Sequence, residues 1–422
     1  MKFSKKLLLT QVVALAAASA AFAGSNGPSL SGLVSRGYPV LNPMVSESVD
    51  GFGVNNELFL LTQRQSGAVK DGVLYVNGRV GLDASYGKRQ NGNSNSKIHT
   101  PGVNLAVTGT KGAATAFVEL NNNKVSTSNT TANAGGRNWG NYTNGTDNSL
   151  HGTAVQVKQA YLMLGDLNKS PLYLVAGRKN VDYGSFDNLD WYWKPVTNYW
   201  NPLQQDQVAV GVYANGLHVA GTVFNGADMY GGNTNGAYKN ISNFAVTASY
   251  GTMLQKAGIE LGVSYLNGLT NDLNGHDLNT TNGGTSVLHK SNYRNPAGIV
   301  FGKLTFGPVS LNALYQQAFK ENTATVNYKP RSWGVTGKVD FGLMDRANWI
   351  AVNYSTSQTS KDASKQEVSQ FLVGWNMALT DAISATLQYG HKHDNKYTYA
   401  NTRANRTDVK DNFVDLGFYA YF

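Results

Sequence analysis

Acidic and aromatic residues gather in one stretch of the sequence, residues 180–206, which reads NVDYGSFDNLDWYWKPVTNYWNPLQQD. The residues that could act on a charged solute are Asp182, Asp187, Asp190, Asp206, Trp191 and Trp193. Because the stretch contains many aromatic side chains, which are unfavourable when exposed to water, we expect it to pack against other parts of the protein. If the acids of this stretch face basic side chains of the wall, such as Arg79, Arg178 or Lys338, the two sets create a transverse field that acts on passing ions. The alternative is a lid packed over the mouth of a pore.

The histidines give little support for catalysis or metal binding. His391 and His393 stand two residues apart, which places both imidazoles on one face of a strand, but a zinc site needs further ligands. The other histidines lie mostly in expected connections, without a nucleophile motif near them. Cysteine is absent, so disulfide and thiol chemistry are not available. We therefore expect no catalytic residue, no metal and no cofactor.

The elements that would position these side chains are strands. In 73–86, apolar residues occupy every second position, with Asn77, Arg79 and Asp83 between them. This period predicts a strand with one apolar and one polar face. About sixteen segments follow the same pattern: 73–86, 103–110, 113–120, 153–164, 172–179, 207–214, 217–225, 241–251, 257–267, 296–306, 309–320, 331–341, 347–357, 367–379, 381–392 and 410–422.

Short and long connections alternate between these segments. The short ones include Asn215-Gly216, a strong hairpin signal. The long ones are 87–102, 121–152, 180–206, 226–240, 268–295, 321–330, 358–366 and 393–409. Short periplasmic turns and long extracellular loops are typical of a transmembrane antiparallel up-and-down β-barrel, so we predict an all-β fold of this kind. About sixteen strands leave room for an aqueous channel.

The beginning of the chain indicates two further segments. Residues 1–23 combine a basic start, an apolar run and an A-x-A pattern, which predicts a secretory signal peptide. Residues 24–72 contain a short predicted helix that begins at Asn55 or Asn56 and ends at Gly67. This segment is either a small plug inside the barrel or a flexible periplasmic leader. The barrel itself is expected to span 73–422.

The last strand keeps its alternation up to Phe422. Leu416, Phe418 and Phe422 share its apolar face. A strand with this pattern is expected to pair on both sides, as in a closed barrel, which has no free edge. We interpret these three residues as a signal for the barrel-assembly machinery.

One stretch resembles a known group of outer-membrane proteins. LMLGDLNKSPLYLVAGRKNVDYGSFD is similar to a segment of LbtU-like siderophore porins of intracellular gammaproteobacteria, and NNELFLLTQRQ is similar to the helix ahead of their barrel. The matching residues are Leu164-Gly165, Leu167, Ser170-Pro171, Tyr173, Gly177-Arg178 and Gly184. The resemblance implies a barrel that passes ferric siderophore without an energy-coupling partner.

The residues themselves also favour passive passage. Segment 24–72 is too short for a globular plug, and the strands are fewer than the 22 of energised transporters. We expect a protein of the Gram-negative outer membrane, in contact with lipid, small solutes such as ferric siderophore, and other copies of itself. Basic residues are scattered, which argues against nucleic acid. A second class of function stays open, in which the long Asn-, Thr- and Gly-rich loops bind host or phage partners.

Overall fold

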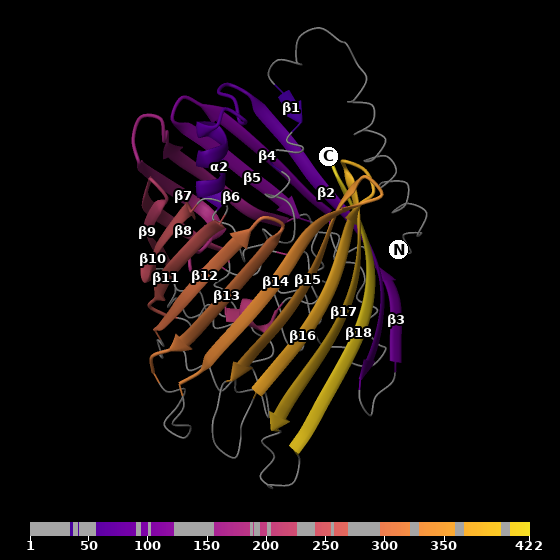
Figure 1. Ribbon diagram of the computed structural model, residues 1–422. Coiled ribbons are helices and arrows are strands. Elements are labelled where there is room, and N and C mark those ends of the chain that lie inside the picture. Colours follow the sequence, from indigo (N-terminus) through magenta and orange to yellow (C-terminus); the bar gives the residue numbers. More distant parts are fainter. Residues whose placement is uncertain are drawn as a thin grey trace, which may run out of the picture.

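Strands with alternating apolar and polar residues pair edge to edge until the sheet closes on itself (Figure 1). The computed structural model describes residues 34–36, 41, 56–89, 94–99, 103–121, 156–185, 189, 195–200, 204–225, 241–254, 257–268, 296–320, 329–358, 367–397 and 406–422.

Sixteen antiparallel strands form the closed wall, which confirms the predicted fold class. They are β2 (Leu74–Arg89), β4 (Val103–Lys111), β5 (Ala114–Asn121), β6 (Gln156–Gly165), β7 (Leu172–Asn180), β8 (Gln204–Ala214), β9 (Leu217–Asn225), β10 (Ile241–Leu254), β11 (Ala257–Leu266), β12 (Ala297–Phe306), β13 (Val309–Ala318), β14 (Arg331–Leu343), β15 (Arg346–Gln358), β16 (Glu367–Ala378), β17 (Ile383–Tyr397) and β18 (Arg406–Tyr421). Each pairs with the next, and β18 closes the wall on β2.

The period of two places apolar side chains outside and polar side chains inside. On β2, Leu82 is 49% exposed, whereas its neighbour Asp83 is 2% exposed. The outward residues of β14 and β16 include Trp333, Val335 and Phe371, as their alternation predicts. An apolar outer surface around a polar interior is the arrangement that a bilayer requires.

Two short strands were not predicted. β3 (Ser94–His99) lies in the expected connection 87–102 and pairs with β2 beyond the point where β4 stops, at Val80. β1 (Val34–Arg36) runs parallel to the start of β2 and pairs with Leu74–Val76, which β18 does not reach. Both strands pair with backbone groups at the edges of β2 that would otherwise lack a partner strand. β2 and β18 are the longest strands of the wall, and the line along which they pair is the seam of the barrel.

Two helical elements lie among the described residues. Helix α2 (Asn56–Gln65) lies inside the barrel near the end where the short turns are, hereafter the short-turn end (Figure 1). Its expected stop is confirmed, since Gly67 has a φ of 77°. The 3₁₀ helix η3 (Val196–Trp200) belongs to the connection between β7 and β8. Within the described ranges, neither this nor any other helix has the length and hydropathy to cross a membrane.

Candidate functional site: the barrel lumen

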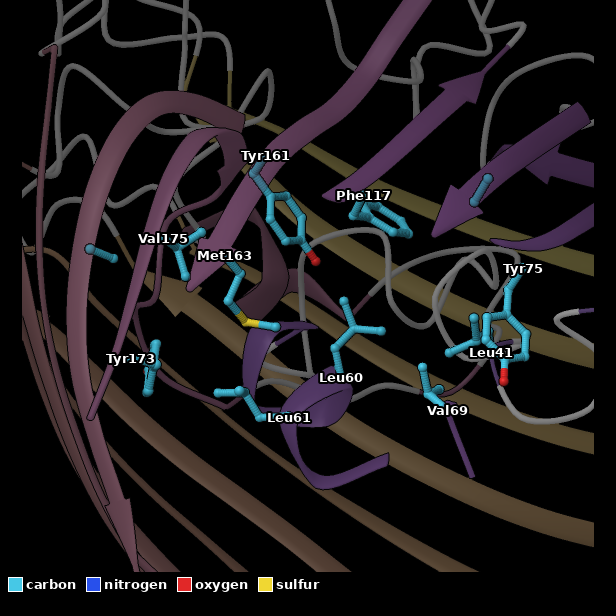
Figure 2. Close-up of a cluster of buried hydrophobic side chains, with 12 residues drawn as sticks. Leu41, Leu60, Leu61, Val69, Tyr75, Phe117, Tyr161, Met163, Tyr173 and Val175 are labelled. Atoms are coloured by element: carbon cyan, nitrogen blue, oxygen red, sulfur yellow. The ribbon is translucent and has the colours of Figure 1, made fainter. Parts of the chain in front are cut away.

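Helix α2 packs its apolar face against the inner wall. Leu60 and Leu61 are fully buried, and Figure 2 shows them facing Tyr161, Met163 and other residues of β5–β8. Burying a leucine is worth about 1.5–3 kcal/mol, so these two side chains alone hold the helix firmly. The helix therefore occupies the lumen along β5–β8 rather than extending below the barrel.

Polar contacts fix the two ends of α2. Near its start, the Glu57 carboxylate pairs with Lys179 of β7, and both side chains are buried. Near its end, Arg64 donates to Thr115 Oγ1 (2.8 Å) and to the carbonyl oxygen of Gly165 (3.2 Å). It also donates to the carbonyl of Gly112 in the turn between β4 and β5. The helix is thus tied to the wall of β5–β7 at both ends.

The connection between β7 and β8 also enters the barrel. Val181 and Tyr183 are buried in a cluster formed by lumenal side chains of β9–β13. The Gly184 amide donates to Ser264 Oγ (2.9 Å), and the Thr247 hydroxyl donates to the Asp182 carbonyl (2.8 Å). The segment thus leaves β7 and runs along the inner wall.

Further along, the same connection reaches the opposite wall. Leu189 packs on a small cluster of Ala351, Leu372 and Phe413. In η3, the Val196 amide donates to Ser355 Oγ of β15 (3.1 Å), and the Thr197 carbonyl accepts from Gln316 of β13 (2.8 Å). β15 lies eight places from β7 in the order of the sixteen wall strands, which is half the circumference. The connection therefore contacts lumenal side chains on two sides of the barrel.

Part of the inner wall keeps water-accessible charges. Near the short-turn end, lumenal Lys303 of β12 is exposed and stands directly opposite Glu260 of β11. On β14, Lys338 and Asp340 form an ion pair of 2.8 Å, and their side chains are 25% and 51% exposed. These residues face the half of the lumen that α2 leaves uncovered, so β11–β14 offer a polar surface to a solute.

The predicted pore residues lie in different surroundings. Lys338 lines the accessible wall described above. Arg79 is buried at the seam, with its guanidinium carbon 4.2 Å from the centre of the Tyr419 ring, and Tyr419 donates to Asp83 (2.8 Å). Asp182 lies in the lumen, 4.0 Å from Nε2 of His218. The structure therefore does not place these three side chains in one ring of charge.

Arg178 and Asp206 do not share the expected lumenal position. They oppose each other in the register of β7 and β8, and Asp206 is exposed next to outward Val208 and Val210. The reason is that β8 begins at Gln204, so Asp206 belongs to a strand whose alternation turns it outward. Asp187, Asp190, Trp191 and Trp193 lie outside the described residues.

The three residues of the predicted last strand that we interpret as an assembly signal lie in two different settings. Leu416 and Phe418 are exposed on the outward face of β18. Phe422 exchanges two backbone hydrogen bonds with Gly78 of β2, of 2.9 and 3.1 Å. The end of the chain thus takes part in closing the seam, and recognition of these residues by assembly machinery stays a prediction.

One buried polar cluster, on β4, β5 and β6, was not predicted from the sequence. Glu119 of β5 accepts hydrogen bonds from Asn104 (2.9 Å), Lys158 (3.0 Å) and Gln159 (3.0 Å). A β-bulge at Lys158 lets two adjacent residues of β6 reach one carboxylate. The signal was present, since outward Val157 and Leu162 are not in step with each other across the polar pair Lys158-Gln159.

Comparisons with known proteins support the barrel. No family model matches the chain. A UPF0422 protein of Coxiella burnetii is 24% identical over 305 residues, 65% of this chain, and the match spans 61% of the length of that relative. Among solved structures, the anion-selective porin of Comamonas acidovorans has a TM-score of 0.52 and 13% identity, over 83% of this chain and 99% of that one.

Two further porins agree with this result. OprB of Pseudomonas putida has a TM-score of 0.52 and 12% identity, over 82% of this chain and 93% of that one. OmpF of Salmonella typhi, solved with daunomycin, has a TM-score of 0.50 and 16% identity, over 83% and 97%. At these identities the likeness is one of fold. The chain has the β-barrel fold of porins, and its narrower resemblance to siderophore porins stays a prediction.

Proposed function

We propose that the chain is an outer-membrane porin through which small hydrophilic solutes diffuse passively. The observation that supports this proposal most directly is the connection between β7 and β8, which is bound to the wall half a circumference away. A wide barrel needs such a constriction to select among solutes. Residues 1–23 act as its secretory signal, 24–72 as a small lumenal plug and 73–422 as the barrel.

Near the short-turn end, the passage in this proposal follows the side of the lumen that α2 leaves uncovered. It runs along β11–β14, past Lys303 and Lys338, because α2 covers the wall of β5–β8. Charged side chains that remain hydrated attract counter-ions and lower the cost of solute entry. Asp182, near the start of the β7–β8 connection, adds an acidic side chain to the lumen.

Ferric siderophore is the narrower substrate that we propose. It rests on the similarity of residues 162–187 to siderophore porins, and no lumenal side chain described above selects for it. A test is swelling of liposomes that contain the refolded barrel, with sugars of increasing size and then a ferric siderophore. Graded swelling with the sugars supports a porin, and swelling with the ferric but not the iron-free siderophore supports the narrower substrate.

A second function is favoured by one observation, the extent to which the short-turn end is filled. Leu41 is buried beside Tyr75, and its carbonyl accepts from Asn77 of β2 (2.9 Å), so chain outside the barrel wall covers β2 as well as β5–β8. If the lumen is sealed, the barrel anchors the protein in the membrane, and its long loops bind host or phage partners. Liposomes that carry folded protein and do not swell with any solute would favour this function.

A further inference from the structure

The outward surfaces of β17, β18 and β2 change character at one level. In the register, Tyr389, Val414 and Tyr86 form an apolar and aromatic row across the three strands. The next outward row toward the long loops consists of His391, Asn412 and Lys88, and His393 and Lys410 pair in the row after it. Three adjacent strands thus turn from apolar to basic and polar at the same height.

This height corresponds to the edge of the hydrocarbon layer. From Val414 to Phe422, β18 presents apolar residues at every outward position over nine residues. A tilted transmembrane strand needs about 9–11 residues to cross the hydrocarbon. Because the run starts at the short-turn end, Asn412 and its neighbours lie at the level of lipid headgroups at the long-loop end.

The described outward side chains of this patch carry net positive charge. Lys88 and Lys410 are exposed, and none of the described outward side chains of these three strands is acidic. On the adjoining β16, the first outward acid is Glu367, two positions beyond Ser369, which opposes His393. On β7 and β8, by contrast, Arg178 directly opposes the acidic Asp206. The β17–β18–β2 patch is therefore suited to an anionic group.

Asn412 is held in a defined orientation within this patch. Its Oδ1 accepts from the Tyr389 hydroxyl (3.1 Å) and from Nδ1 of His391 (2.8 Å). With the oxygen engaged twice, its amide nitrogen remains as the donor toward a ligand. Directly opposed residues have Cβ atoms about 5 Å apart, so the Asn412 amide and the Lys88 ammonium can reach the same group.

We propose that Lys88, Lys410 and Asn412 bind a phosphate group of an outer-leaflet glycolipid, with Tyr389 and His391 positioning Asn412. Two ammonium groups and an amide supply charge-assisted and neutral hydrogen bonds to phosphate oxygens. The apolar row of Tyr389, Val414 and Tyr86 lies directly below, where acyl chains begin. The inference depends on the position of the barrel in a membrane and not on its conductance, so failure of the channel function would leave it standing.

The test measures binding of bisphosphorylated lipid A to the refolded full barrel in detergent by native mass spectrometry. The test variant is Lys88→Gln with Lys410→Gln, and the matched control is Lys303→Gln with Lys338→Gln, which removes two lumenal charges. Because each basic residue near an anionic surface changes the affinity about fivefold, we expect the test variant, which lacks two of them, to bind about 30-fold more weakly. The control variant should bind as the unmodified protein does.

Two further arms identify the source of the phosphate. Dephosphorylated lipid A should bind the unmodified barrel as weakly as the test variant binds the bisphosphorylated form, and inorganic phosphate in millimolar excess should not displace the lipid. Equal binding by the test variant and the unmodified barrel would overturn the proposal. Displacement of the lipid by inorganic phosphate would also overturn the proposal, because the site would then bind a free anion rather than the lipid. Asn412→Ala should weaken binding without changing heat-dependent migration of the folded barrel.

Discussion

The ion pair between Glu57 and Lys179 offers the sharpest test of how α2 is held in the lumen. Glu57 is 1% exposed and Lys179 is 2% exposed, so Lys179→Met leaves a carboxylate buried without its partner. Breaking a buried pair in this way costs about 3–5 kcal/mol. The two leucines of α2 contribute together a similar amount, so the loss should shift the helix toward an undocked state.

The absence of cysteine makes this shift measurable. Leu60→Cys places one thiol in the interface between α2 and the wall, and maleimide labels it only when the helix leaves the wall. Since about 1.4 kcal/mol corresponds to tenfold, adding Lys179→Met should raise the labelling rate about 100-fold or more. Adding Glu57→Leu as well removes the unpaired charge and should return the rate to within about tenfold of the starting protein.

Three results would refute this reasoning, provided that heat-dependent migration shows a folded barrel. The first is fast labelling of Leu60→Cys without any other change, because the helix would then not be docked. The second is an unchanged rate with Lys179→Met. The third is equally fast labelling with Lys179→Met alone and with Lys179→Met plus Glu57→Leu, because the unpaired buried charge would then not be the cause of undocking.

Three other predictions concern the wall and the β7–β8 connection. Lys338→Glu reverses a charge on the accessible lumenal wall and should shift the reversal potential in a salt gradient toward cation preference, whereas outward Lys410→Glu should not. Gly390→Ala places a Cβ in the ring of Phe413, directly opposite in the register, and should destabilise the barrel by about 1–3 kcal/mol in urea titrations. Gly221→Ala, whose Cβ meets nothing within 4 Å, is its control. Burial raises the pKa of Tyr183, so the stability that it contributes is present below the pKa of an unfolded tyrosine, about 10, and is lost as the pH rises above it. Tyr183→Phe should make the loss of urea stability above that pH smaller, and an unchanged alkaline loss would contradict the assignment.

The strands could be predicted because their signal is local. Alternation along each segment sets which side chains face outward, and the end of α2 follows from Gly67 alone. The outward position of Asp206 was missed for a similar local reason, since the expected strand started at 207 and the observed one starts at Gln204. A shift of strand boundary by a few residues was enough to assign this acid to the wrong face.

The contacts that hold these segments in the lumen could not be predicted, because they join distant parts of the chain. The partners Glu57 and Lys179 are 122 residues apart, and Val196 meets Ser355 across 159. Composition indicated that the β7–β8 connection needs apolar surroundings, but it did not indicate which wall supplies them. The β-bulge at Lys158 and the cluster around Glu119 likewise depend on the pairing of two strands.

The central claim is that the lumen, although narrowed by α2 and the β7–β8 connection, passes solutes. Single-channel recording of the refolded protein in a planar bilayer tests it most directly. We predict stable open steps in potassium chloride, with larger steps when Gln316→Ala and Ser355→Ala release η3 from the wall. Silence from inserted, correctly folded barrels, both unmodified and with η3 released, would contradict the claim.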